Sequence, residues 1–112
     1  MNIFKKLIFI IKQNKKKSSK VSYTALLFKK GSRFCINKFM EESKELSNAL
    51  KQSIKKNIIS ESADMLYHFL VLLELKKIKF SDILKELKKR QKISGIEEKL
   101  NRKNVRQKSY IR

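Results

Sequence analysis

The chain has 112 residues, of which 41% are apolar, which is enough for one hydrophobic core but not for two. Proline is absent and glycine occurs only twice, and this argues against hairpin-rich β folds. A single cysteine, Cys35, excludes a disulfide framework within the chain and favours a reducing, cytoplasmic location. The early apolar run, residues 7–11, is far too short for a membrane span, so we expect no membrane insertion.

The charge of the chain is strongly positive, with 29 basic and 10 acidic residues and a formal net charge of +19. The excess is concentrated in residues 1–20 and 76–112, whereas residues 21–75 are nearly balanced. This distribution suggests an anionic partner such as nucleic acid, a membrane surface or a polyphosphate. A compositional bias typical of an AT-rich genome explains the lysines equally well. A non-enzymatic helical protein that coats nucleic acid is therefore one candidate function.

The first predicted elements are two short helices. Apolar residues recur at spacings of three and four along the whole chain, which predicts an all-α fold. The leading helix carries Ile3 and Leu7 on its apolar face and ends in a polar connector at residues 14–20. Ser22 opens the second helix, and Gly31 ends it as the residue after its C-terminus.

Two long helices are expected next, because neither glycine nor proline occurs between residues 32 and 94. The first covers residues 33–51, and its apolar face consists of Ile36, Phe39, Leu46 and Leu50. The second covers residues 57–77 and is apolar nearly all round, which is typical of a central, buried helix. The remaining chain is too short to wrap this helix, so we expect self-association as a homodimer that completes a helical bundle.

A shorter helix is expected to follow, with Ser81 as its N-cap and Ile83, Leu84 and Leu87 as its buried side. Beyond residue 93 the composition becomes charged. We therefore expect one all-α domain over residues 1–93 and a loosely held basic tail over residues 94–112.

The acidic residues carry the most information about function. Five of the ten occur in two motifs, Glu41-Glu42-x-x-Glu45 and Glu61-x-x-Asp64. Residues three apart on a helix are neighbours, so Glu42 pairs with Glu45 and Glu61 pairs with Asp64. Two antiparallel helices would bring these pairs together into an all-oxygen site of the kind that Mg²⁺ or Mn²⁺ prefers. Such a site in a lysine-rich chain indicates phosphate chemistry.

The competing interpretation treats these acids as ordinary surface partners of the lysines. It suits Glu41, which points away from the apolar face of its helix. It suits Glu61 and Asp64 less well, because they lie on a stripe that continues through His68 into the core, where adjacent carboxylates are costly without a cation. The surface interpretation is supported by the position of Glu61 and Asp64 in the first turns of a helix, where the macrodipole favours negative charge.

The motifs, taken together with their surroundings, resemble the MazG-like all-α nucleotide pyrophosphohydrolases. The flanking sequences are Ser22-Tyr23-Thr24-Ala25 before Gly31, Lys38-x-x-Glu41-Glu42, Glu61-Ser62-Ala63-Asp64-Met65-Leu66-Tyr67-His68, Ile83-Leu84-x-Glu86-Leu87-x-x-Arg90 and Ser94-Gly95-Ile96-Glu97-Glu98-Lys99. In this order and spacing the chain most closely resembles the phosphoribosyl-ATP pyrophosphohydrolase (phosphoribosyl-ATP diphosphatase) family of histidine biosynthesis. The resemblance extends from about residue 3 to residue 103.

This resemblance implies a hydrolase that uses Mg²⁺ and cleaves phosphoribosyl-ATP between its α- and β-phosphates, releasing phosphoribosyl-AMP and pyrophosphate. It also implies that Glu42, Glu45, Glu61 and Asp64 are the catalytic metal ligands. A MazG-like enzyme acting on other nucleoside triphosphates is the alternative within the same superfamily.

Three lysines are candidate phosphate-binding residues. Relatives usually carry Lys or Arg where this chain has Leu26, and Lys29 or Lys30, about one turn further along, are candidates to replace that contact. Lys38 lies on the same helix stripe as Glu42, where it is suited to neutralising phosphate charge. The alternative for Lys38 is a simple ion pair with Glu42, four residues further on.

Two further residues, Glu41 and His68, are candidates for supporting the ligand set from just outside it. A buried histidine whose hydrogen bonds are satisfied in the core would explain His68 equally well. The sequence shows no interleaving of aromatic and basic residues and no recognisable reading helix, so we do not expect a nucleic-acid partner.

Overall fold

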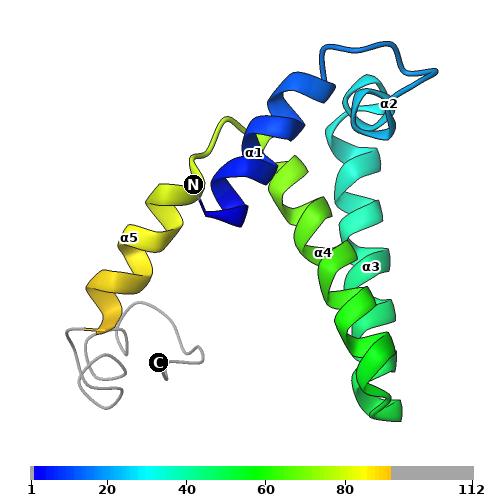
Figure 1. Ribbon diagram of the computed structural model, residues 1–112, viewed down its shortest axis with the longest axis vertical. Helices are drawn as coiled ribbons and strands as arrows, with labels where there is room; N and C mark the ends of the chain where they lie inside the picture. The colour runs from blue at the N-terminus through cyan, green and yellow to red at the C-terminus, as the bar shows by residue number, and fades with distance from the viewer. Residues whose placement is uncertain (1, 92–112) are drawn as a thin grey trace. The chain divides into compact units, whose positions relative to one another are not determined.

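The computed structural model describes residues 2–91, and within these residues the chain forms five α-helices and no strand. The helices are α1 (Ile3–Asn14), α2 (Tyr23–Lys30), α3 (Ser32–Gln52), α4 (Lys55–Leu75) and α5 (Phe80–Gln91) (Figure 1). The all-α class expected from the sequence is confirmed. The chain divides into two compact units between Ile78 and Lys79, and each unit is described by itself. The domain boundary expected at residues 93 and 94, and the basic tail after it, lie outside the described residues.

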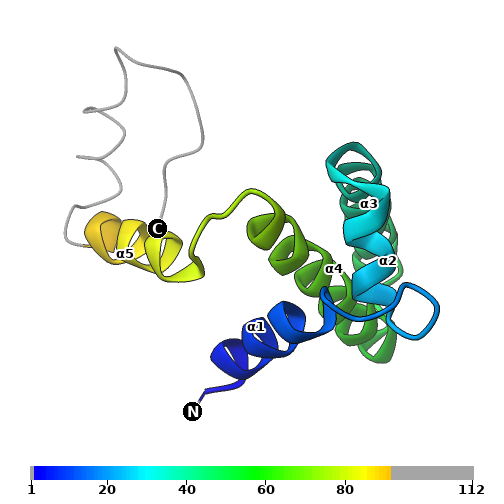
Figure 2. The ribbon, with the colours of Figure 1, turned by 90° about the horizontal axis from the view of Figure 1, so that it is seen from above.

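Helices α3 and α4 form a hairpin and lie side by side along their length (Figures 1 and 2). Only Ser53 and Ile54 separate them, and their bounds are within two residues of the expected ones. Ser53 takes the left-handed backbone conformation, with φ of 59°, and its N–H donates to the carbonyl oxygen of Ala49. This αL residue ends α3 and reverses the chain, so the two long helices run antiparallel.

Helix α2 begins and ends at the residues that the sequence indicated. The Ser22 hydroxyl oxygen accepts a hydrogen bond of 3.1 Å from the Ala25 N–H, as an N-cap does. Gly31 has a φ of 92°, which favours glycine, and its N–H donates to the carbonyl oxygen of Leu27. Because Ser32 already belongs to α3, this single glycine joins α2 to the hairpin.

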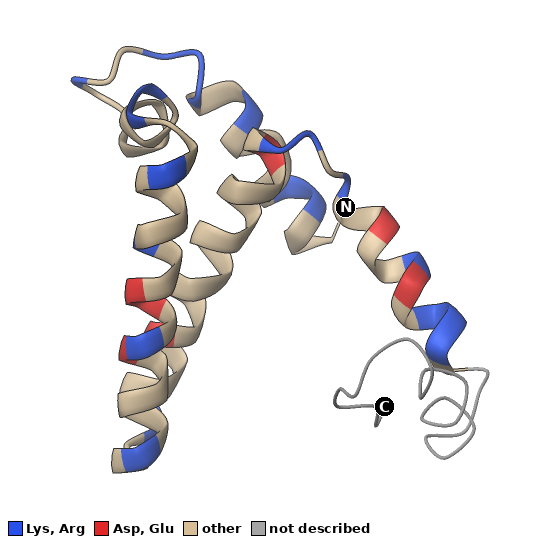
Figure 3. Ribbon diagram, turned by 180° about the vertical axis from the view of Figure 1, so that it is seen from behind, with Lys and Arg blue, Asp and Glu red and all other residues tan. Residues whose placement is uncertain are grey.

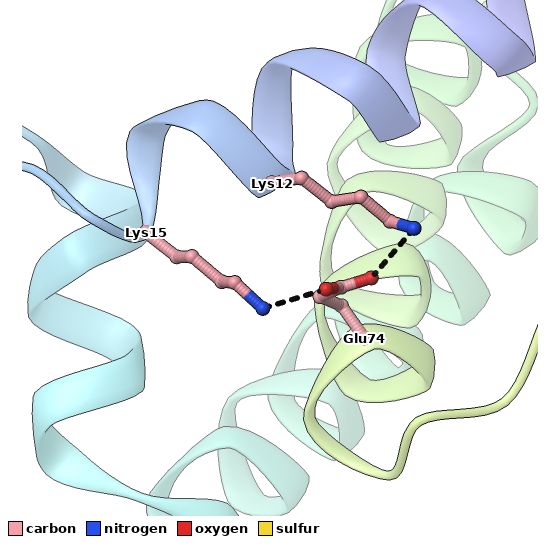
Figure 4. Close-up of polar contacts among 3 residues, drawn as sticks. All are labelled: Lys12, Lys15 and Glu74. Atoms are coloured by element: carbon pink, nitrogen blue, oxygen red, sulfur yellow. Dashed lines mark hydrogen bonds and ion pairs between the residues drawn. The ribbon is translucent and has the colours of Figure 1, made fainter.

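Helix α1 is fixed to α4 by charge. It extends through Asn14, so it reaches one residue into the segment expected to be a connector. Lys15 directly follows it, and the Lys15 ammonium lies 2.7 Å from one carboxylate oxygen of Glu74 in α4 (Figure 4). The Lys12 ammonium lies 4.0 Å from the other oxygen. Lys15 also lies 5.5 Å from the centre of the Phe28 ring, so it connects α1, α2 and α4.

The core of the α1–α4 unit is small and receives a contribution from every helix in it. Its largest fully buried side chains are Ile11 from α1, Leu27 from α2, Cys35 from α3 and Val71 from α4. The Cys35 thiol donates a hydrogen bond of 3.2 Å to the Leu27 carbonyl oxygen. Cys35 is therefore a packed side chain that joins α3 to α2.

The apolar faces of the two long helices are only partly buried in the single chain. Ile36 and Leu50 on α3 are 40% and 53% exposed, although the sequence pattern assigned both to the core. On α4 the buried residues are restricted to His68, Leu70 and Val71. Within a single chain, α1, α2 and α3 thus cover only part of the circumference of α4, as expected from the short length of the remaining chain.

Helix α5 belongs to the second unit and departs from expectation in two ways. The helix already begins at Phe80, so the predicted N-cap Ser81 is wrong: it is a residue inside the first turn. Ile83 is partly buried, but Leu84 and Leu87 are exposed, because a single helix cannot cover its own apolar face. None of the helices within residues 2–91 combines the length and apolar character needed to cross a membrane.

Candidate metal centre and family

Carboxylates from α3 and α4 meet midway along the hairpin. One oxygen each of Glu42, Glu45 and Glu61 lies within 4.8 Å of the others. Figure 3 shows acidic residues of both helices near the middle of the hairpin, whereas a further acid of α4, Glu74, belongs to the contact with Lys15. Asp64 is outside this group of three, yet it acts electrostatically on both Glu42 and Glu61. The structure thus brings the two acidic motifs together, as the sequence pattern suggested.

Burial and mutual repulsion both act on the carboxylates. Burial is the largest cause that raises the pKa of Glu42 and of Glu61 above the usual glutamate range. The neighbouring Glu45 raises the pKa of both further, and Asp64 adds a smaller effect. Lys38 acts in the opposite direction on Glu42. In the absence of a cation, the folded chain therefore disfavours full ionisation of this cluster.

Two oxygens of the cluster are buried and reached by no hydrogen-bond donor among the described residues: Oε2 of Glu42 and Oε2 of Glu61. The side chain of Glu42 is only 13% exposed. Buried carboxylate oxygens are ordinarily paired with a donor or a cation, because an unpaired buried charge is costly. An all-oxygen donor set with two such oxygens fits a hard divalent cation such as Mg²⁺ or Mn²⁺.

His68 lies beside the cluster in the interior of the protein. Its Nε2 atom is 3.9 Å from Oε1 of Glu42, which is longer than a hydrogen bond. Burial lowers the pKa of His68, and the nearby Lys38 lowers it further, so the imidazole is neutral near pH 7. The ring makes an edge contact with Tyr67 at 5.1 Å between centroids. His68 is therefore a packed histidine that lies next to a candidate ligand.

Lys38 pairs with a different carboxylate from the one considered in the sequence. Its ammonium donates to Oε1 of Glu41 at 3.3 Å, so the alternative of an ion pair with Glu42 is wrong. Lys38 and Glu41 are three residues apart and face each other at the helix surface, which explains this choice of partner. The hydrogen bond to Glu41 is the largest cause that raises the pKa of Lys38, so the side chain stays cationic. Glu41 is exposed and lies outside the group of three carboxylates.

Lys29 and Lys30 are exposed in the last turn of α2. The Lys30 ammonium lies 5.3 Å from the centre of the Phe34 ring. From the start of α3, the chain rises roughly 15 Å before it reaches Glu42, at about 1.5 Å per residue. These lysines are thus set apart from the carboxylates along the helix axis, and their role as phosphate contacts stays a prediction.

Tyr23 is a neighbour of the cluster to which the sequence pattern gave no role. Its ring stacks on Tyr67 at 6.3 Å between centroids and meets the edge of His68 at 6.0 Å. No signal in the sequence indicates it, because its neighbours Tyr67 and His68 lie far from it along the chain. Tyr67 is itself only partly buried.

Comparisons with known proteins identify the family. The family model described as phosphoribosyl-ATP pyrophosphohydrolase matches residues 4–91. A phosphoribosyl-ATP pyrophosphatase of Vesicomyosocius okutanii is 42% identical over 99 residues, which cover 88% of this chain and 94% of that protein. A phosphoribosyl-ATP pyrophosphatase of Ruthia magnifica is 39% identical over 103 residues, which cover 92% of this chain and 98% of that protein. A histidine biosynthesis bifunctional protein HisIE of Wolinella succinogenes is 48% identical over 83 residues, which cover 74% of this chain and 36% of that protein. The chain therefore belongs to the phosphoribosyl-ATP pyrophosphohydrolase family.

Proposed function

We propose that this protein is a phosphoribosyl-ATP diphosphatase, which hydrolyses phosphoribosyl-ATP to phosphoribosyl-AMP and pyrophosphate in the biosynthesis of histidine. The observation that carries the proposal is the group of carboxylates from Glu42, Glu45 and Glu61, which includes two buried oxygens without a donor. Membership of the family and the names of its curated relatives support the choice of substrate. A protein that only coats nucleic acid has no need of such a cluster.

Mg²⁺, or Mn²⁺ in its place, is the cofactor that we propose for this cluster, with Glu42, Glu45, Glu61 and Asp64 as ligands. When bound, the ion would act as a Lewis acid toward the phosphates and would offset the charge that develops during cleavage. The protein contributes to metal binding by holding the carboxylates in position. Glu42 and Glu61 each hold one oxygen in the interior, away from water. Because a bound cation would relieve their repulsion, the folded hairpin favours metal binding.

Glu45 is suited to receive the proton that the attacking water loses. Its side chain is exposed, so water reaches it directly, whereas Glu42 and Glu61 are partly buried. A ligand carboxylate in this position makes a separate general base unnecessary. Its proton can then pass to bulk solvent.

Lys38 is the cation that we propose for the transferred phosphates. Among the described residues its ion-pair partner is Glu41, an exposed carboxylate, and such surface pairs are worth little, about 0–1 kcal/mol. A phosphate group can therefore replace Glu41 at modest cost. We assign Lys29 and Lys30 to the second anionic end of the substrate, the phosphate of its phosphoribosyl group. Their separation from the carboxylates along α3 suits a substrate whose phosphates lie at two ends.

A homodimer is the assembly that we propose. Large apolar side chains are exposed on the outer surface of the α3–α4 hairpin: Ile36, Met40, Leu50, Ile59 and Leu66. A second copy of the chain would cover these residues and complete the bundle. Light scattering at micromolar concentration should give twice the chain mass of 13.3 kDa. A mass of 13.3 kDa would contradict the dimer. We further propose a cytoplasmic location, which the single buried cysteine supports.

The experiment that tests the function is pyrophosphate release from a panel of nucleotides with Mg²⁺. Phosphoribosyl-ATP should be cleaved about 10²–10⁴ times better than ATP in kcat/KM, because two charge-assisted phosphate contacts are worth roughly 1.5–3 kcal/mol each. The Glu45→Gln variant is the matched control and should release none. Equal cleavage of ATP, or a preference for a deoxynucleoside triphosphate, would place the protein among MazG-like enzymes of other substrates.

A further inference from the structure

Tyr23 is held in an exposed position by two buried neighbours. Ser22 caps α2 through its hydrogen bond with the Ala25 N–H and also donates from its hydroxyl to the Asn14 carbonyl oxygen at 3.2 Å. The Thr24 hydroxyl is hydrogen-bonded to the Tyr67 hydroxyl at 2.6 Å. Both Ser22 and Thr24 are buried, whereas Tyr23 between them is 49% exposed. The first turn of α2 therefore fixes the backbone on both sides of an aromatic ring that is half open to solvent.

This ring is also fixed by its aromatic neighbours. Its plane is inclined by 25° to that of Tyr67, which the bond to Thr24 holds in place. It meets His68 nearly at a right angle, 88° between planes. The Tyr23 ring thus lies against two neighbouring rings that restrict its movement, and its exposed part offers an aromatic surface. A rigid surface loses little conformational entropy when a flat ligand stacks on it.

The position of the ring relates it to the carboxylates. His68, whose ring centre lies 6.0 Å from that of Tyr23, has its Nε2 atom 3.9 Å from Oε1 of Glu42. Tyr23 is also among the groups that act electrostatically on Lys38, as Glu42 is. The molecule therefore brings a candidate metal ligand, the Lys38 ammonium and an exposed aromatic ring into one neighbourhood.

We propose that Tyr23 is the surface on which the adenine ring of the nucleotide stacks, and that it thereby selects the adenylate end of the substrate. The inference rests on the proposed function and names a residue for base recognition. A nucleotide carries phosphates suited to the carboxylates and Lys38 and a base suited to Tyr23, with its sugar between the two. Aromatic side chains stack readily on bases, since every base has a π face. The phenol hydroxyl is not required for this contact.

AMP and inorganic pyrophosphate, used separately as probes, distinguish the two ends of the site. Isothermal titration with Mg²⁺ present should show that Tyr23→Leu weakens AMP binding roughly tenfold, in keeping with the usual strength of base stacking. Pyrophosphate, which has no base, should bind within twofold of the original protein. Tyr23→Phe keeps the ring and should bind AMP within threefold. The matched control is Phe9→Leu, which replaces an exposed aromatic residue on α1 and should change neither affinity.

Several outcomes would overturn the inference. Equal weakening of AMP and pyrophosphate by Tyr23→Leu would indicate a disturbed site rather than a lost stacking contact. Equal losses in Tyr23→Phe and Tyr23→Leu would indicate a hydroxyl–phosphate contact. A changed mass of Tyr23→Leu in light scattering would show that Tyr23 is a subunit contact. Undetectable AMP binding to the original protein would show that the site does not bind the adenine ring. Because AMP is not hydrolysed, these results are independent of turnover: a protein that binds AMP through Tyr23 but leaves phosphoribosyl-ATP uncleaved would refute the proposed function alone.

Discussion

Glu45→Gln should stabilise the metal-free protein and abolish its activity. Glu45 is the group that, after burial itself, contributes most to raising the pKa of Glu42 and of Glu61. Glutamine keeps the shape of the side chain but removes its charge. The substitution therefore relieves repulsion within the cluster and at the same time removes one of the proposed metal ligands.

The distance between the carboxylates sets the size of the gain. The oxygens of Glu42 and Glu45 lie within 4.8 Å of each other. At this separation two like charges repel by about 0.9 kcal/mol in the dielectric of water and by about 3.5 kcal/mol at an effective dielectric constant near 20. Glu45 is exposed, so the lower figure applies and the expected gain is about 1 kcal/mol. For a domain of this size that raises Tm by roughly 4–8 °C.

Thermal melting in EDTA at pH 7, followed by circular dichroism, measures this gain. Glu41→Gln is the matched control: it removes a charge from the same helix turn, but from a residue that is exposed and paired with Lys38. Its Tm should stay the same or fall slightly. A Tm of Glu45→Gln at or below that of the original protein, with helicity intact, would refute the reasoning, because the carboxylates would then not repel one another.

Three other perturbations should have measurable effects. Mg²⁺ at 100 times its Kd should stabilise the original protein by about 2.7 kcal/mol, and Asp64→Asn should lose most of this shift in Tm although its helicity is unchanged. The raised pKa values of Glu42 and Glu61 favour folding at acidic pH, and this contribution disappears as the pH rises through those values. Between about pH 4 and pH 7 the metal-free protein should therefore lose more stability than Glu45→Gln, and parallel pH profiles in EDTA would contradict this. Glu74→Gln should lower the urea-unfolding free energy by about 1 kcal/mol, because it removes the partly buried ion pair that fixes α1 to α4, and an unchanged midpoint would show that this pair contributes nothing.

Much of the fold follows from local signals in the sequence. Ser22 and Gly31 delimit α2 because a side-chain cap and a positive φ are requirements of single residues. The long helices follow from their periodicity and from the absence of helix breakers. The start of α5 at Phe80 was harder to predict than its existence, because helix ends depend on weak local preferences that differ little between neighbouring residues.

Contacts that depend on neighbours were predicted less well. Periodicity placed Ile36 and Leu50 on an apolar face, but it does not state what covers that face, and within one chain nothing described covers it fully. The partner of Lys38 does not follow from spacing either: an ion pair can form with a residue three or four positions away, and side-chain orientation selects Glu41 over Glu42. The aromatic contacts of Tyr23 could not be predicted, because Tyr67 and His68 lie far from it in the sequence.

The meeting of the two acidic motifs shows how a short turn determines a site. Glu45 lies eight residues before Ser53 and Glu61 lies eight residues after it, so both rise by about 12 Å from the turn along antiparallel helices. They therefore lie at the same level, and Glu42, a further three residues before Glu45, shares their face of the hairpin. Moving either motif by one residue would turn its carboxylates by about 100° around the helix axis, away from the partner helix. The spacing between the motifs thus matters as much as the acids themselves, and the αL turn at Ser53 converts that spacing into a cluster.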